Sequence, residues 1–106
     1  MKDMEFRIAD DVGLCRKSDS GYESYMIGNV WGFDGFACGA FLGFESSKPI
    51  TREEALECLI NECDVAPENA EAELEKPGLS IEETIQNLVD HGYTVKDARI
   101  AIGYKE

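Results

Sequence analysis

The second half of the chain contains two segments that begin with the same helix-starting pattern. Thr51 is followed three positions later by Glu54, and Ser80 is followed in the same way by Glu83. In such a capping box, the two side chains satisfy backbone N–H groups that the first helical turn leaves unpaired. An apolar stripe follows each box: Leu56, Leu59, Ile60 and Cys63 after the first, and Ile81, Ile85, Leu88 and Val89 after the second. The pattern predicts an amphipathic helix in each segment.

A short second helix is predicted after each of these two. Pro67 suits the first turn of one, and Thr94 is a suitable N-cap for the other. Gly92 is expected to end the preceding helix in the left-handed conformation, and Pro77-Gly78 is expected to separate the two units. Each segment therefore predicts an αα-hairpin, and either an internal duplication or independent convergence explains their similarity.

The first half of the chain follows a different pattern and contains seven of the ten glycines. Residues 4–8 alternate apolar and polar side chains, which predicts a half-buried strand. Asp10-Asp11 can turn the chain into a short second strand over residues 12–17, and the composition of residues 18–21 indicates a loop.

The strongest turn signal is Asp34-Gly35, between two predicted strands over residues 25–33 and 36–44. Asp-Gly favours a type I′ hairpin, because both central residues of that turn need positive φ angles. In the resulting register one face of the hairpin is aromatic. The other face has few side chains, because glycines occupy many of its positions. The aromatic face is then either an interaction surface, such as the seam of a homodimer, or a surface that loops cover.

Together these patterns predict one α+β domain over residues 1–106, because a chain of this length has room for one. An antiparallel β-meander of three or four strands would occupy residues 1–46, and four short helices in two αα-hairpins would occupy residues 50–106. The N-terminal segment lacks the apolar core of a signal peptide. None of the four cysteines has C-x-x-C spacing. We therefore expect reduced thiols and a cytoplasmic protein.

The net charge of −12 excludes several classes of partner. A protein that neutralises phosphates needs a basic face, so direct nucleic-acid binding is not expected, and neither is docking on an anionic membrane. Residues 51–106 carry 14 acids and five bases, against eight and five in residues 1–50. The acids there fall at helical spacing, at Glu68, Glu71 and Glu75 and again at Glu83 and Asp90. Such acidic faces serve either solubility or the binding of a basic partner.

No pattern in the chain indicates catalysis. His91 is the one histidine and lies in the last turn of a predicted helix, where its charge would complement the helix dipole. The chain has no phosphate-binding loop, no metalloprotease motif and no nucleophile elbow. The sequence therefore predicts no enzymatic activity, no cofactor and no metal site.

The leading hypothesis is a non-enzymatic acidic protein that inhibits its partner by occupying a basic, nucleic-acid-binding surface. In size and charge the chain is similar in type to phage anti-CRISPR and anti-restriction proteins. Each contacting carboxylate would stand in for a phosphate of the nucleic acid. The expected contacts are Glu68, Glu71, Glu75, Glu83 and Asp90.

The alternative hypothesis rests on residues 88–93, Leu-Val-Asp-His-Gly-Tyr, followed by Ala98. They resemble the first two helices of ubiquitin-associated domains, whose loop carries a Met-Gly-Phe/Tyr signature, with His91 in place of the usual Met. The resemblance covers about a fifth of the chain. The alternative is an adaptor that combines this hairpin with the predicted aromatic sheet face and binds a peptide or protein at Tyr25, Trp31, His91 and Tyr93. A third reading, a ligand-binding domain or small enzyme, would need a deep polar pocket beside the Trp31 indole.

Overall fold

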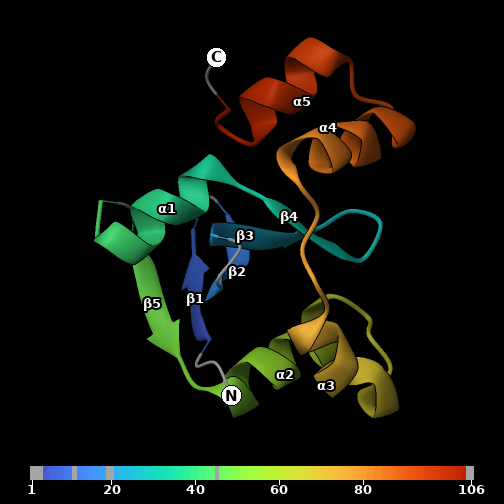
Figure 1. Cartoon of the computed structure of the whole chain (residues 1–106). Helices are drawn as coiled ribbons and strands as arrows, with labels where there is room; N and C mark the ends of the chain where they lie inside the picture. Colours follow the sequence, from blue (N-terminus) through green and yellow to red (C-terminus); the bar gives the residue numbers. More distant parts are fainter. Residues whose placement is uncertain (1–3, 11, 19–20, 45, 105–106) are drawn as a thin grey trace.

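The structure of the protein is a computed structural model that describes residues 4–10, 12–18, 21–44 and 46–104. The described residues form an antiparallel sheet and five helices, which confirms the predicted α+β class (Figure 1). Asp11 of the predicted first turn, and two residues of the predicted 18–21 loop, lie outside the described residues. The elements are β1 (Glu5–Ala9), β2 (Gly13–Ser18), β3 (Gly21–Met26), β4 (Val30–Phe33), α1 (Gly35–Leu42), β5 (Ser47–Ile50), α2 (Arg52–Glu62), α3 (Pro67–Glu75), α4 (Ile81–Asp90) and α5 (Val95–Ala101).

The sheet begins as a four-stranded meander, within the predicted three or four strands, although its fourth strand is not the predicted 36–44. Its strand order is β4-β3-β2-β1-β5, so β1 to β4 pair with their neighbours in the chain and β5 returns beside β1. All four strand pairs are antiparallel. The short β5 lies where the sequence changes from strands to helices, and it adds an edge strand that the sequence pattern did not predict.

The hairpin predicted around Asp34-Gly35 is wrong, because the chain turns earlier. Gly28 and Asn29 have positive φ angles of 91° and 56°, and the Asn29 N–H donates to the Met26 carbonyl at 3.1 Å. Glycine and asparagine are the residues that most readily adopt such angles. The single strand predicted over this region is therefore the end of β3, a turn and β4.

Asp34 begins helix α1 instead of turning a hairpin. Its carboxylate accepts hydrogen bonds from the Phe36 N–H at 2.9 Å and from the Ser24 hydroxyl at 2.8 Å. Gly43 ends the helix with a φ of 83°. An aspartate N-cap and a glycine just past the last turn are the ordinary terminal signals of a helix. Because residues 36–44 form no strand, the predicted aromatic sheet face does not exist.

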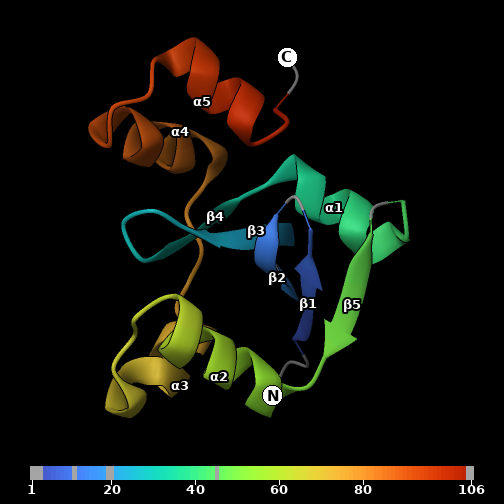
Figure 2. The ribbon, with the colours of Figure 1, turned by 180° about the vertical axis from the view of Figure 1, so that it is seen from behind.

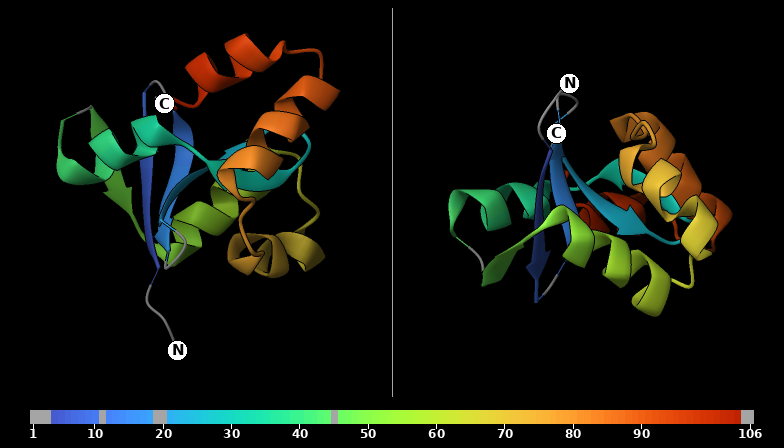
Figure 3. Two further views of the ribbon diagram at one scale, coloured as in Figure 1. Left: turned by 45° about the horizontal axis from the view of Figure 1, so that its top comes forward. Right: turned by 90° about the horizontal axis from the view of Figure 1, so that it is seen from below.

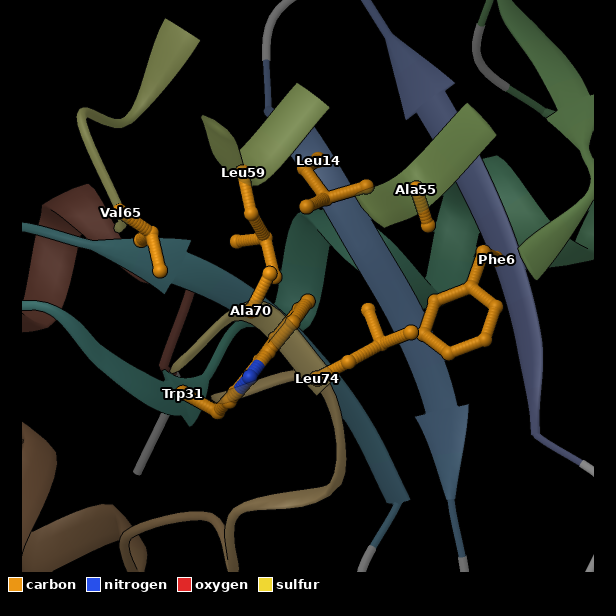
Figure 4. Close-up of a cluster of buried hydrophobic side chains, with 8 residues drawn as sticks. All are labelled: Phe6, Leu14, Trp31, Ala55, Leu59, Val65, Ala70 and Leu74. Atoms are coloured by element: carbon orange, nitrogen blue, oxygen red, sulfur yellow. The ribbon is translucent and has the colours of Figure 1, made fainter. Parts of the chain in front are cut away.

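One face of the sheet packs against the α2–α3 hairpin. Apolar side chains from the sheet and from both helices form a buried cluster there, the largest among the described residues. Burial of apolar surface is the dominant favourable term in folding. Its buried members are drawn in Figure 4: Phe6, Leu14, Trp31, Ala55, Leu59, Val65, Ala70 and Leu74.

The opposite face is covered by α1 and the α4–α5 hairpin (Figures 1 and 2). Successive residues of a strand point to opposite faces of the sheet. Leu14 belongs to the cluster under α2–α3, so its neighbour Cys15 points to the opposite face. Two smaller clusters lie here: Ala9, Cys15, Ala37 and Ala40 beneath α1, and Leu88, Ala98 and Ile102 within α4–α5.

The two helical hairpins start as the sequence predicts. The capping box of α2 joins Thr51 and Glu54, and that of α4 joins Ser80 and Glu83, with both reciprocal hydrogen bonds formed in each. The hydroxyl of Thr94 accepts from a backbone N–H at the start of α5. Pro67 is the first residue of α3, as predicted, so local signals predicted the beginning of all four C-terminal helices.

The linker between the hairpins carries the chain from one face of the sheet to the other. Residues 76–80 run beside β4, where the Leu79 N–H donates to the Trp31 carbonyl at 2.8 Å. Figure 1 shows the two hairpins at opposite ends of this linker, and Figure 3 gives two further views of the same arrangement. The predicted break at Pro77-Gly78 is thus a connection along one edge of the sheet.

Candidate protein-binding surface

A buried ion pair fixes the end of α3 to the sheet. The Nε atom of Arg16 donates to Glu23 Oε1 at 2.9 Å, and the two residues expose only 1% and 2% of their surface. The same guanidinium donates to the carbonyls of Leu74 and Lys76 at 2.7 and 2.5 Å, and it lies 4.3 Å from the centroid of the Trp31 ring. A cation is favourable at a helix C-terminus, so the pair holds this end of α3 in place.

Two aromatic side chains hold the preceding turn of α3. The Trp31 indole donates to the Glu73 carbonyl at 2.6 Å, and the Tyr25 hydroxyl donates to the Glu73 carboxylate at 2.8 Å. Burial and the bond to Glu73 raise the pKa of Tyr25 above its ordinary value, so its hydroxyl keeps its proton at neutral pH. Trp31 is fully buried. This member of the alternative binding set therefore lies in the core, where a partner cannot reach it.

The solvent side of the α2–α3 hairpin is strongly acidic. Residues 51–76 contain nine carboxylates and two bases, a balance of −7, whereas residues 80–104 contain four and two, a balance of −2. The excess charge of the second half therefore lies on one hairpin, on one side of the sheet. We call its exposed carboxylates the α2–α3 acidic surface: Glu53, Glu54, Glu57, Glu62, Asp64, Glu68, Glu71 and Glu75.

Three of the five predicted contact residues belong to this surface. Glu68 and Glu71 are exposed on α3 and have no ion-pair partner among the described residues. Glu75 is exposed as well and pairs with Arg52 of α2. The structure therefore brings these three carboxylates together on α3, at the spacing that the sequence predicts.

The other two predicted residues lie elsewhere, on α4. The Glu83 carboxylate accepts from the Ser80 N–H at 3.0 Å, and this bond lowers the pKa of Glu83. Asp90 accepts from the side-chain amide of Gln86 at 2.8 Å. Because α4 covers the opposite side of the sheet from α3, the structure does not place the five residues on one surface.

A groove of about 590 Å³ lies between α2 and the β1–β5 edge of the sheet. It adjoins the α2–α3 acidic surface, because Glu54, Glu57 and Glu62 line it. The sequence indicated Glu54 only as a helix cap and did not indicate Glu57 or Glu62 as site residues, although all three contribute to the charge excess after residue 50. The remaining lining residues are Ile8, Asp10, Gly13, Leu14, Ser46, Ser47, Lys48, Ile50, Cys58 and Asn61.

His91 and Tyr93, of the alternative set, lie at the turn between α4 and α5. His91 is exposed, with Nδ1 2.7 Å from the Asn87 carbonyl oxygen. Gly92 has a φ of 103°, which confirms the predicted left-handed conformation. Tyr93 is 41% exposed. Both side chains are exposed on the α4–α5 hairpin, whereas Trp31 is buried in the cluster under α2–α3.

Three exposed apolar side chains belong to α1 and to the residue that follows its C-cap. Phe36, Leu42 and Phe44 are 45%, 54% and 79% exposed. Residues 35–44 carry no charge. The predicted homodimer seam would therefore lie on this helix rather than on an aromatic hairpin, and self-association stays a prediction.

The described residues offer little that points to metal or thiol chemistry. No group of three or more His, Cys, Asp or Glu side chains among them could hold a metal ion. All four cysteines are free. Burial raises the pKa of Cys15 and of Cys58 to about 11, so these thiols keep their protons at neutral pH. Within the same residues, no helix combines the length and apolar character needed to cross a membrane.

Comparison with known proteins finds no family model, curated protein or solved structure that matches the chain. The functional conclusion therefore rests on where the fold places its charges. Two features carry it: the α2–α3 acidic surface and the groove beside it.

Proposed function

We propose that the protein is a non-enzymatic inhibitor whose α2–α3 acidic surface occupies a basic, nucleic-acid-binding surface of a partner protein. The observation that carries the proposal is the uneven charge of two similar hairpins, −7 on α2–α3 and −2 on α4–α5. The effect of charge on solubility acts through the net charge of the whole molecule. A role in solubility alone therefore gives no reason for the carboxylates to gather on one hairpin.

The position of α3 supports the proposal. Its last turns are held by the buried Arg16–Glu23 pair and by the Trp31 and Tyr25 hydrogen bonds to Glu73. A surface that is ordered before binding loses less conformational entropy when the complex forms. The exposed carboxylates of α3 are thus presented on a backbone that need not rearrange.

The charges themselves supply the mechanism of binding. Glu68 and Glu71 are three residues apart on α3, where like charges repel by a few tenths of a kcal/mol. A basic partner would relieve this repulsion and would be steered toward the surface as it diffuses. The carboxylates would then take the place of phosphates and exclude the nucleic acid.

A capture experiment with matched charge reversals tests the proposal. The tagged full-length chain is incubated with cell lysate at 50 and 500 mM NaCl, and the retained proteins are identified by mass spectrometry. We expect nucleic-acid-binding proteins that are retained at low salt and released by high salt or by added DNA, because screening weakens contacts between exposed charges. Capture that is equal at both salt concentrations would contradict the proposal.

Two double variants locate the interaction. Glu68→Lys with Glu71→Lys should weaken capture about tenfold or more, since each reversal replaces an attraction with a repulsion. The matched control on α4 is Glu82→Lys with Asp90→Lys, which changes the net charge equally and also alters one first-turn residue. The control should retain the partner. Equal losses for both variants would show that binding depends on net charge alone.

The α4–α5 hairpin offers a second candidate, an adaptor function. Tyr93 and Val95, at and just after the turn of this hairpin, are 41% and 48% exposed. In that case Tyr93→Ala would abolish capture, capture would persist at 500 mM NaCl, and the reversals at Glu68 and Glu71 would have no effect. The same assay therefore decides between the two candidates.

A further inference from the structure

We propose that the groove between α2 and the β1–β5 edge binds one bulky aliphatic side chain from a basic segment of the partner protein. The inference rests on the proposed function, because it assigns a second contact to the partner of the α2–α3 acidic surface. It commits to a segment in which a leucine or isoleucine is flanked by lysine or arginine residues.

The floor of the groove is apolar and incompletely covered. Phe6 and Ile8 lie on the same face of β1, because they are two residues apart in a strand. Phe6 is 5% exposed beneath the helices, whereas Ile8 is 40% exposed and lines the groove with Leu14 and Ile50. The core face of the sheet therefore continues past α2 into open space. A volume of about 590 Å³ is within the range of ligand-binding clefts.

The rim of the groove selects the charge of the occupant. Among the described lining residues, four carry carboxylates, Asp10, Glu54, Glu57 and Glu62, and one, Lys48, carries an ammonium group. All five side chains are exposed. The apolar floor does not select the charge of the residues beside the bound aliphatic side chain. The acidic rim does, because it attracts flanking lysine or arginine residues and repels flanking acids.

The neighbouring sheet edge argues against recognition by strand addition. A strand that adds to a sheet needs a free row of N–H and C=O groups. The middle of edge strand β5 is occupied by Pro49, which has no N–H to donate. At the other edge, the linker already bonds to β4 through Leu79. Binding through side chains in the groove is therefore the mode that the geometry favours.

Two blocked peptides test the inference on the unmodified full-length chain. Lys-Lys-Leu-Lys-Lys and Lys-Lys-Gly-Lys-Lys have equal charge and differ only in the central side chain. Titration followed by NMR should show the leucine peptide binding about tenfold more tightly, as partial burial of one leucine predicts. The largest amide shifts should fall at Ile8, Ile50 and Glu57. Equal affinities, absent binding, or shifts confined to α1 or α5 would overturn the inference.

Single variants separate the floor from the rim. Ile8→Ser should remove the preference for the leucine peptide, and Glu57→Gln should weaken both peptides about twofold to threefold. The matched controls are Ile100→Ser, at an apolar residue of α5 that is 61% exposed, and Glu82→Gln on α4. Both controls should leave both affinities unchanged. Thermal unfolding of each variant checks that it is folded, and the comparison of peptides on the unmodified chain does not depend on any variant.

The outcomes keep the groove and the proposed function apart. If the two peptides bind equally while the Glu68 and Glu71 reversals still abolish capture, the groove inference fails and the inhibitor proposal stands. If the leucine preference is found but partner capture is insensitive to salt and to those reversals, the inhibitor proposal fails and the groove remains a peptide site.

Discussion

The two faces of the sheet are covered by similar helical hairpins that are attached in different ways. Against one face, α2–α3 shares a cluster of eight buried residues with the sheet, and the buried Arg16–Glu23 pair reinforces the contact. Against the other, α4–α5 has a buried cluster of three, and its hydrogen bonds include one from the Phe33 N–H to the Thr84 hydroxyl at 3.0 Å and one from the Asn87 side-chain amide to the Ile27 carbonyl at 2.8 Å. The two hairpins begin with the same capping box, but they contact different residues of the sheet. Their attachment to the sheet therefore differs.

The more firmly anchored hairpin also carries more of the charge. Like charges at helical spacing destabilise a helix by a few tenths of a kcal/mol per pair. A large shared core offsets such repulsion, and the smaller α4–α5 cluster would do so less well. The larger buried cluster under α2–α3 therefore allows this hairpin to have an exposed surface of mutually repelling carboxylates, as the proposed function requires. The predictions below test this difference between the two hairpins.

The largest expected effect is on the anchor of α3. Arg16→Met should lower the free energy of unfolding by about 3–5 kcal/mol, because it leaves the Glu23 carboxylate buried without its cation. Equilibrium unfolding in urea measures the change. The double variant Arg16→Met with Glu23→Met should lose less than the single variant, since no uncompensated charge remains. A loss below about 1 kcal/mol for Arg16→Met would show that the pair does not anchor the hairpin.

The two capping boxes should have nearly equal effects. Thr51→Ala and Ser80→Ala each remove the acceptor for one backbone N–H, which should cost about 1 kcal/mol. Amide hydrogen exchange of α2 and α4 in the two variants reports the change in each hairpin. If Ser80→Ala loosens α4–α5 alone while Thr51→Ala affects the whole protein, the hairpins differ in how strongly they are coupled to the sheet.

Asp34 provides a pH test on the α1 side of the sheet. Burial raises its pKa, so the folded state holds this proton more tightly than the unfolded state does. As the pH rises above the ordinary value of 3.8, the unfolded state ionises first, and the stability contributed by this group falls. Asp34→Asn keeps a capping acceptor and removes the ionisable group, so it should become more favourable relative to the parent as the pH rises above 3.8. A difference that does not vary with pH would contradict the assigned burial of the charge.

The smallest expected effect concerns the acidic surface itself. Glu71→Lys should raise the free energy of unfolding by a few tenths of a kcal/mol, because Glu68 and Glu75 lie three and four residues away on α3. Glu82→Lys should bring no such gain, since it places a cation in the first turn of α4. Urea unfolding at low and high salt should show the Glu71→Lys gain shrinking as salt screens the charges. A loss of stability on Glu71→Lys would show that Glu71 has a structural role.

The sequence predicted the helices of the second half better than the strands of the first. Capping boxes and an N-cap threonine act through neighbours three residues away, so their meaning is nearly independent of the rest of the fold. Asp34-Gly35 is different, because Asp-Gly suits both a hairpin turn and a helix start. The choice depends on the Ser24 hydroxyl, a tertiary partner that the local sequence does not reveal.

Only part of the candidate surface was predicted, because local patterns give the spacing of residues on one helix but not the placement of helices on the sheet. The spacing of Glu68, Glu71 and Glu75 on one helix followed from the helical repeat. Whether Glu83 and Asp90 would join them depended on how the two hairpins sit on the sheet, and helical spacing contains no information on that. The groove residues Glu57 and Glu62 were missed because a cleft between a helix and a sheet edge exists only once both are placed.

The amino-acid sequence by itself determined the α+β class, the starts of α2, α3, α4 and α5, and the acidity of the chain. These features follow from interactions between residues close in the chain or from composition alone. Only the tertiary structure decided that α1 is a helix, that the hairpins cover opposite faces, and that three carboxylates of α2 line an open groove. Those features depend on packing between residues far apart in sequence, such as Arg16 with the end of α3, which a local pattern cannot specify.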